Sequence, residues 1–334
     1  MTMTTSLITG GAGFMGSHLA RECLALGHTV VVLDDLSGGF RSNVPEGALF
    51  VEGSVEDAAL VNRLFAEHRF QYVYHLAAYA AEGLSHFIRT YNYRNNLLGS
   101  MTLVNASVNS GTVERFVFTS SIAVYGAGQT PMTEATVPQP EDPYGVAKYA
   151  VEMDLRAAQH MFGLDFTVFR PHNVYGPHQN IGDRYRNVVG IFMNQVMRGR
   201  AMPIFGDGLQ TRAFTYIDDV VPVIARAVGT AQARNEVFNL GADMPRTVRD
   251  VAAAVAAAFG VAPDIEHLPP RSEVVHAFSD HRKVVERLGT AGAYVPLEEG
   301  VRRMAEWARA QGPRRTPAFQ GIEVDRNLPP SWRD

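Results

Sequence analysis

The sequence predicts an α/β fold in which a doubly wound parallel sheet is joined to a smaller, discontinuous α/β lobe. Short apolar runs alternate with helical patterns over the first half of the chain, as in βαβ units. The runs VVVL and RFVFTS are apolar on both alternating positions, which is typical of strands covered by helices on both faces. The chain has 334 residues. Because single cores stop growing at about 250–300 residues, we expect two lobes.

The alternation ends after Arg170 in a stretch rich in Gly, Pro and Asn, which we interpret as a loop that opens the second lobe. Strands are predicted at Leu7–Thr9, Thr29–Leu33, Tyr72–His75, Arg115–Thr119 and Phe166–Arg170, and the first helix at Gly16–Leu26.

Two later runs, Ala213–Ile217 and Val237–Leu240, are expected to return to the sheet. Helices are predicted at Thr247–Phe259, where alanine favours helix, and at Leu297–Ala310. The sheet lobe is therefore assigned residues 1–172 and 212–243, and the second lobe residues 173–211 and 244–334. The tail from Gly312 is expected to form an irregular strap over the surface.

Composition excludes several classes of partner. The net charge of −4 and the lack of a dense Lys and Arg stripe argue against nucleic acid. No run of 18 residues lacks polar breaks, so no membrane span is expected. The single cysteine, Cys23, is interpreted as a buried hydrophobe and permits no intrachain disulfide. Without a signal-peptide pattern, the protein is expected to be cytoplasmic.

The segment SLITGGAGFMGSHLA places Gly10, Gly13 and Gly16 between the first strand and the first helix. Glycines there permit a tight turn, a close approach to a pyrophosphate and close packing of the helix. The helix N-terminus would then face the phosphates. A merely structural turn is the alternative, but the position between strand and helix favours a Rossmann-type dinucleotide site.

Asp34 follows the run VVVLD at the end of the second strand, where an acid hydrogen-bonds the adenosine ribose. A carboxylate at this place also repels the extra phosphate of NADP, so NAD is the predicted cofactor. Asp35 is interpreted as an ordinary solvated acid.

Tyr144 and Lys148 lie four residues apart in the helical pattern PYGVAKYAVEMDL, so their side chains share one face. An ammonium beside a phenol lowers the pKa of the phenol, and a tyrosinate can take a hydroxyl proton. A surface pair is the alternative for Tyr144 and Lys148. The strand end FVFTSS argues against it by placing Ser121 where α/β sheets present ligand-binding groups. Thr119 and Ser120 are interpreted as hydrogen-bonding the backbone groups at the end of the strand.

Six motifs occur in order along the chain: TGGAGFMG, Asp34, HLAA at 75–78, SSIAVYG at 120–126, YGVAK at 144–148 and RPHNVYGP at 170–177. Together they resemble the extended short-chain dehydrogenase/reductase family, in its nucleotide-sugar epimerase branch. The resemblance extends to about residue 310 and implies NAD retained through the cycle, and a homodimer formed by helices near 91–109 and 145–162. Its implied cofactor contacts are Phe14, Met15, Leu76, Ala77 and Ala78, with Asn96 as a buttress.

The resemblance also implies contacts with the adenine of the cofactor and with a nucleotide-sugar substrate. Ser54 and Val55 stand where relatives carry an adenine-reading Asp and an apolar residue, which is a departure from the family pattern. Arg271 is the candidate second phosphate clamp, but it lies in a motif one residue shorter than the family's. The implied diphosphate and base contacts are Asn173, Asn187, Val188, Pro203, Ile204, Phe205 and Arg212.

Ile122 and Ala123 reduce the number of family reactions that the site is expected to catalyse. Relatives that eliminate water carry Asp-Glu at these places, and decarboxylases usually carry Glu at the second. Apolar side chains transfer no protons, so the hypothesis is 4-epimerisation of a nucleoside-diphosphate sugar through a 4-keto intermediate, with UDP favoured. A dehydratase, decarboxylase or reductase of the family, or a non-catalytic NAD-sensing regulator, is the alternative.

The segment AYAAEGLSHFIR carries polar groups near where the sugar is expected. Glu82 or His86 is hypothesised to contact a sugar hydroxyl or substituent, the alternative being a helix-start acid and a packed histidine. His172 and His178 show no metal-ligand spacing, and no metal is predicted.

Overall fold

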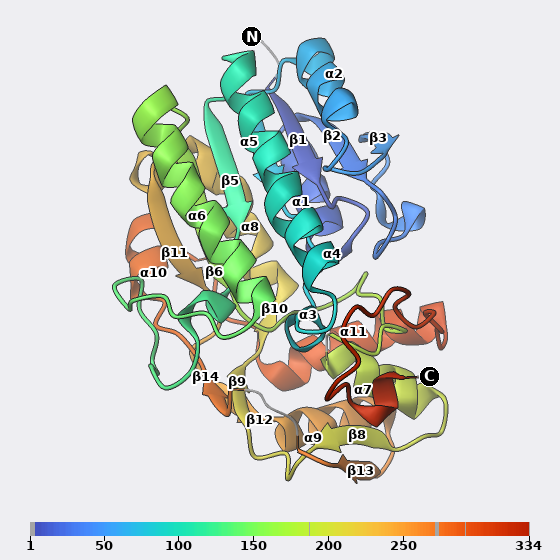
Figure 1. Ribbon diagram of the computed structural model, residues 1–334. Coiled ribbons are helices and arrows are strands. Elements are labelled where there is room, and N and C mark those ends of the chain that lie inside the picture. Colours follow the sequence, from blue (N-terminus) through green and yellow to red (C-terminus); the bar gives the residue numbers. More distant parts are fainter. Residues whose placement is uncertain (1–3, 187, 271–273, 291, 334) are drawn as a thin grey trace.

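The computed structural model describes residues 4–186, 188–270, 274–290 and 292–333. Its centre is a seven-stranded parallel sheet of order β11-β6-β5-β4-β1-β2-β3, which confirms the predicted fold class (Figure 1). The strands are β1 (Thr5–Thr9), β2 (Thr29–Asp34), β3 (Leu49–Glu52), β4 (Tyr72–His75), β5 (Arg115–Thr119), β6 (Phe166–Pro171) and β11 (Glu236–Leu240).

Helices cover both faces of this sheet, and the alternation of side chains along each strand decides which helix each residue meets. In β1, Ile8 belongs to the apolar cluster that contains α1 and α8, whereas its neighbour Leu7 belongs to the cluster that contains α2, α5 and α6. The sheet and its covering helices are called the sheet lobe. The helices are α1 (Phe14–Ala25), α2 (Ala58–His68), α5 (Gly99–Ser110), α6 (Pro143–Phe162) and α8 (Val221–Arg226).

Short elements lie beyond the carboxyl ends of β4 and β5. Two short helices and a π-helical turn lead into α5, and a 3-10 turn follows β5. Their bounds are α3 (Glu82–Ser85), α4 (Arg89–Tyr93), η2 (Arg94–Leu98) and η3 (Ile122–Tyr125).

The second lobe, below the sheet in Figure 1, consists of three helices and small paired strands. β8 pairs with β13, and β9 pairs with both β12 and β14. Their bounds are α7 (Val188–Met197), β8 (Met202–Phe205), β9 (Thr211–Ala213), β12 (Pro245–Thr247), α9 (Val248–Phe259), β13 (Ile265–Leu268), β14 (His276–Ala277) and α11 (Leu297–Gln311).

The predicted return of Ala213–Ile217 to the main sheet is wrong. This run divides into the end of β9 and β10 (Thr215–Tyr216), and β10 pairs with β7 (Val174–Tyr175) in a separate two-stranded sheet. The other run, Val237–Leu240, does return to the main sheet as predicted, because β11 pairs with β6. α10 (Arg282–Leu288) packs against β11, so part of the late chain also returns to the sheet lobe.

The tail after α11 has neither helix nor strand from residue 312 to residue 329 and ends in a 3-10 turn at Pro330–Trp332, as expected of an irregular strap. Among the described residues, no helix is long and apolar enough to cross a membrane.

Candidate active site

One cleft of about 1310 Å³ lies between the sheet lobe and the second lobe. Its volume exceeds the roughly 300–1,000 Å³ of an ordinary small-molecule site, as a site for two large ligands requires. Residues predicted for the cofactor line it on the sheet side: Gly10, Gly13, Phe14, Met15, Asp34, Val55, Leu76, Ala77 and Ala78.

The loop from β1 to α1 is built around its glycines. Gly10 has φ of +72°, and a β-carbon there would lie 2.8 Å from the Ala77 nitrogen. A β-carbon on Gly16 would lie 2.2 Å from the Gly10 oxygen. Gly13 caps α1 without a side-chain hydrogen bond, so the first-turn N–H groups, which a helix leaves unsatisfied, face the cleft beside Phe14 and Met15. Such a helix N-terminus suits a pyrophosphate.

Asp34 lies at the end of β2 and is 8% exposed. Its carboxylate accepts backbone N–H groups from Ala12 at 2.9 Å and from Leu36 at 2.8 Å. Burial raises the pKa of Asp34 above its ordinary value, and these two hydrogen bonds oppose the rise. The carboxylate is therefore held rigidly beside the glycine loop, where a ribose hydroxyl would reach it.

Two predicted cofactor residues lie behind the wall of the cleft. The Ser54 hydroxyl accepts the Glu56 N–H at 3.1 Å in the approach to α2. The Asn96 amide holds Tyr79 from both sides, accepting its N–H at 2.8 Å and donating to its oxygen at 3.2 Å. Asn96 thus supports the segment that follows β4.

Ser121, Tyr144 and Lys148 come together where the sheet lobe lines the cleft: Tyr144 hydrogen-bonds Ser121, and the Lys148 Nζ lies 5.8 Å from the centre of the Tyr144 ring. Asp142 caps α6 by accepting the Gly145 N–H at 2.9 Å, which starts the helix just before Tyr144. A β-carbon on Gly145 would lie 2.6 Å from the Ala123 oxygen. The missing side chain therefore lets the turn that carries Ser121 approach the helix that carries Tyr144.

Burial raises the pKa of Tyr144, and Glu82 and Asp142 add to the rise, whereas a hydrogen bond with Ser121 and the charge of Arg186 oppose it. The side chains by themselves keep the phenol neutral. The predicted net lowering of this pKa is therefore not produced by the protein's own side chains, because desolvation outweighs the favourable contributions of Ser121 and Arg186.

Lys148 is 2% exposed, and its ammonium donates to the Thr119 oxygen at 2.8 Å. Burial lowers the pKa of Lys148 to about 7, and the carboxylate of Glu152 one turn further along α6 opposes the fall. The lysine can therefore gain or lose a proton near neutral pH.

A buried ion pair stands behind this centre and was not predicted from the sequence. The Glu152 carboxylate accepts the Ser120 hydroxyl at 2.5 Å and the Arg170 Nε at 2.9 Å. Arg170 also donates to the Tyr125 hydroxyl at 2.7 Å. These bonds tie β5, α6 and β6 together beside Ser121, Tyr144 and Lys148. Thr119 Oγ1, which lines the cleft, has no hydrogen-bond partner within the described part of the chain.

The second lobe supplies the remaining walls. The Arg212 guanidinium donates to the Val274 and Val275 oxygens at 2.5 and 3.0 Å, which fixes its direction. Asn173 adopts φ of +43°, a conformation that asparagine tolerates. Asn187 and Arg271 lie outside the described residues. Predicted substrate residues that line the cleft are Ser121, Asn173, Val188, Pro203, Ile204, Phe205 and Arg212.

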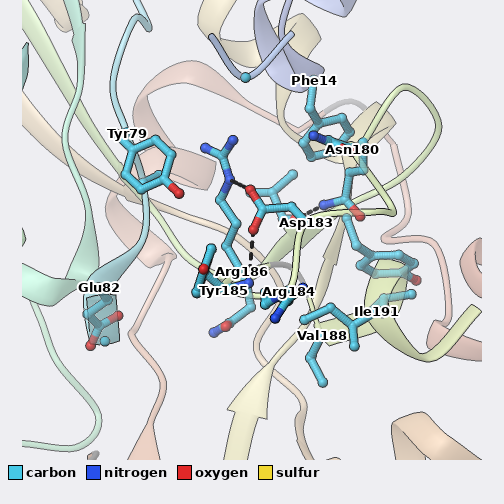
Figure 2. A pocket seen from close by; sticks show the side chains of 18 of the residues that line it. Phe14, Tyr79, Glu82, Asn180, Asp183, Arg184, Tyr185, Arg186, Val188 and Ile191 are labelled. Atoms are coloured by element: carbon cyan, nitrogen blue, oxygen red, sulfur yellow. Dashed lines mark hydrogen bonds and ion pairs between the residues drawn. The ribbon is translucent and has the colours of Figure 1, made fainter. Parts of the chain in front are cut away.

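Figure 2 also shows cleft residues that the sequence did not single out, among them Asp183, Tyr185 and Arg186. Arg186 pairs with Asp183 at 2.7 Å and lies 4.8 Å from the centre of the Tyr79 ring. The charged run DRYR at 183–186 was the available signal, but it was interpreted as loop. Glu82, the first residue of α3, and His86 also line the cleft, and their contact with the sugar stays a prediction.

The cofactor side fits a dinucleotide through the glycine turn, the helix N-terminus and Asp34. A comparison with family models agrees, since residues 6–241 match the model described as "NAD dependent epimerase/dehydratase family". The chain belongs to this family. NAD is accordingly its cofactor.

Relatives extend the match to most of the chain. A UDP-glucose 4-epimerase of Mycolicibacterium smegmatis is 35% identical over 312 residues, covering 91% of this chain and 98% of its own. The structure of a UDP-glucose 4-epimerase with UDP-glucose, from Thermotoga maritima, has a TM-score of 0.88 and 37% identity, covering 92% of this chain and 99% of its own.

A UDP-glucose 4-epimerase from Thermus thermophilus in complex with NAD has a TM-score of 0.83 and 33% identity, covering 91% of this chain and 98% of its own. Other relatives include a decarboxylase and dehydratases. The comparisons therefore show the family and leave the net reaction to be argued from the site.

Proposed function

We propose that this family member interconverts the C4 epimers of a nucleoside-diphosphate sugar, with UDP as the favoured nucleotide, through a transient 4-keto sugar. The observation that carries the proposal is the meeting of Ser121, Tyr144 and Lys148 on one wall of a cleft whose other walls suit a dinucleotide and a diphosphate. The epimerases named above support it by their likeness over most of the chain.

NAD, which the glycine turn and Asp34 would hold, would supply a reversible acceptor for the hydride at C4 of the sugar. Tyr144 takes the proton of the C4 hydroxyl as the hydride leaves and gives it back when the hydride returns. Ser121 hydrogen-bonds the same oxygen. Because burial keeps the phenol neutral, we assign its activation to the positive charge of the nicotinamide and to Lys148 when protonated.

Ile122 and Ala123 favour epimerisation over the alternatives. They follow Ser121 directly, and η3 begins at Ile122. Elimination of water needs an additional acid and base near the sugar, and apolar side chains supply neither. In an epimerase the keto sugar only rotates to present its other face, so no further proton transfer is required.

We assign the diphosphate to Asn173 and Arg212, because guanidinium and amide groups are the donors that a buried diphosphate requires. Val188 opens α7, and Phe205 ends β8, so both present apolar surface to the cleft where a base would lie. Asn187 and Arg271 remain proposed contacts on the strength of the family pattern.

Product analysis of a panel of nucleotide sugars tests the proposal. UDP-glucose and UDP-galactose should each yield a mixture of both, with no change of mass. Loss of water or of carbon dioxide would indicate a dehydratase or a decarboxylase, and no turnover with any nucleotide sugar would indicate a regulator.

We further propose a cytoplasmic homodimer that pairs through α5 and α6. Large apolar side chains stand exposed on and next to these helices, as partner-facing residues do: Leu98, Val146, Met153, Met161 and Phe162. A clean monomer in light scattering would count against the dimer, and cell fractionation tests the location.

A further inference from the structure

The C-terminal tail forms one wall of the cleft. Ser331 and Trp332, at the end of the chain, line the same cleft as Ser121 and Tyr144. Figure 1 shows the tail, in the darkest red, passing between α3 of the sheet lobe and α7 of the second lobe. A strap on the outer surface would not line the cleft, so this placement of the tail calls for a functional explanation.

Paired polar contacts fasten the beginning of the tail to the second lobe and the loop before it. The Arg314 N–H donates to the Asn194 side chain at 2.9 Å, and the Asn194 amide donates to the Arg314 oxygen at 3.0 Å. The Thr316 hydroxyl donates to Asn180 at 2.9 Å. A β-carbon on Gly182 would lie 2.7 Å from the Thr316 hydroxyl, so the loop fits closely against the tail.

The middle of the tail is fastened to the sheet lobe. The Glu323 carboxylate accepts the N–H groups of Thr90 and Tyr91, at 2.8 and 2.9 Å, at the start of α4. The Glu323 N–H donates to the Phe87 oxygen at 2.8 Å. The tail therefore spans from one lobe to the other across the cleft.

Between these anchors an aromatic cluster fixes the wall in place. The Phe319 ring lies 5.2 Å from that of Tyr79, and the Trp332 ring lies 5.4 Å from that of Tyr185 in an edge-to-face arrangement. The Tyr185 hydroxyl accepts the Phe319 N–H at 3.1 Å. Trp332 is 5% exposed, so its indole is packed on nearly all sides. A wall held in this way cannot retreat to admit a larger ligand.

This wall stands at the reacting end of the cleft. The same apolar cluster contains Ala81 and Leu84, which flank Glu82 in the chain. α3, which carries Glu82 and Leu84, meets the start of α6, where the Ser85 hydroxyl donates to the Asp142 carboxylate at 3.4 Å, two residues before Tyr144. Figure 2 shows Tyr79, Glu82 and Tyr185 around one space. The ligand group nearest this wall is therefore the group that reacts with Tyr144, and in the proposed function that is the sugar.

We propose that the tail determines sugar specificity: Trp332, with Tyr79 and Tyr185, closes the sugar subsite so that it admits hydroxyl-bearing sugars and excludes those with an N-acyl substituent. The inference rests on the proposed function. Aromatic rings offer a rigid surface to the C–H face of a sugar ring, and the tail's anchors on both lobes hold that surface at a set distance from Tyr144.

Trp332→Ala and a chain that ends at Gly312 test the inference. For each variant, kcat/KM is measured with UDP-glucose and with UDP-N-acetylglucosamine. The ratio of kcat/KM for UDP-glucose to kcat/KM for UDP-N-acetylglucosamine should fall by about 10-fold or more. This is the range by which apolar pockets discriminate between small groups. Trp332→Phe should restore most of the ratio. Val324→Ala, at a tail residue that is 41% exposed, is the matched control and should leave the ratio unchanged.

Binding of UDP alone separates a sugar wall from a merely structural tail. Trp332→Ala should change the Kd for the UDP-sugar and leave the Kd for UDP within error, as measured by calorimetry. An equal loss for both ligands, or an unchanged ratio of kcat/KM, would overturn the inference while leaving the epimerase proposal intact. A wild-type protein that neither binds nor converts any UDP-sugar would overturn both.

Discussion

Exchange of Lys148 for methionine is expected to stabilise the protein while abolishing its turnover. Lys148 is 2% exposed, donates to the Thr119 oxygen at 2.8 Å, and lies 4.7 Å from the centre of the Phe118 ring. Burial lowers its pKa from 10.5 to about 7. A methionine side chain would fill much the same space without an ionisable group.

The magnitude follows from that pKa. Between about pH 7 and pH 10.5 the unfolded chain holds a proton that the folded protein has lost, so the free energy of unfolding of the wild type rises with pH. The free energy of unfolding rises by about 1.4 kcal/mol per pH unit. Over about 3.5 pH units this adds up to about 5 kcal/mol, which is the cost of burying the charged lysine at neutral pH. Loss of a hydrogen bond from a charged donor offsets about 1.5–3 kcal/mol. We therefore expect Lys148→Met to gain about 2–3.5 kcal/mol in the free energy of unfolding at pH 7.

Urea unfolding of both proteins between pH 7 and pH 10 is the assay, because other titrating groups cancel in the difference. The advantage of the variant should shrink by about 1.4 kcal/mol per pH unit as the pH rises. Lys283→Met, at a lysine that pairs with Glu236 at 2.8 Å, controls for the exchange itself. A difference that stays constant with pH, or a variant that is less stable at every pH, would refute the reasoning.

Four further predictions concern the site and the dimer. Tyr144→Phe should lower kcat by about 10²–10⁴-fold with NAD still bound, and initial rates that stay near wild type would remove Tyr144 from its assigned role. Asp34→Ser should weaken NAD and strengthen NADP in a fluorescence titration, because the carboxylate no longer repels the extra phosphate; an unchanged ratio of Kd values would contradict this. Glu152→Gln should cost about 3–5 kcal/mol in urea unfolding, since Arg170, 2% exposed, would keep an unpaired charge; a loss below 1 kcal/mol speaks against it. Met153→Glu on α6 should convert a dimer to a monomer in light scattering, and a dimer that persists would place the interface elsewhere.

Much of the sheet lobe could be predicted because the patterns that specify it lie within short segments of the sequence. Strands buried on both faces must be apolar throughout, and glycines at the first turn leave a fixed spacing in the chain. The carboxyl ends of parallel strands share one edge, so Asp34 and Ser121 could be placed at the same side of the sheet without knowing the fold in detail. The four-residue spacing of Tyr144 and Lys148 likewise fixed a common helix face.

Strand pairing outside the main sheet was not predictable in this way. The run Ala213–Ile217 has the alternation of a strand, and the pattern is satisfied equally by any partner that buries one face. Here β10 pairs with β7, across the loop that follows β6. The choice depends on how the chain packs after Arg170, which periodicity does not report.

The electrostatic state of the centre depends on burial, which one sequence specifies poorly. The spacing of Tyr144 and Lys148 indicated a favourable charge, but the depth of both side chains reverses the balance for the phenol. The pair of Glu152 and Arg170 joins residues 18 apart on different elements, and the contact of Trp332 with Tyr185 joins residues much further apart. Such contacts become visible only once the fold is assembled.

Deuterium at C4 of UDP-glucose tests the central claim most directly, because it follows the hydride itself. We expect that [4-²H]UDP-glucose is converted to a mixture with UDP-galactose in which deuterium stays at C4 of both sugars, as observed by NMR. Deuterium found at C6 with loss of water, or replaced by solvent hydrogen, would contradict reversible hydride transfer at one sugar carbon.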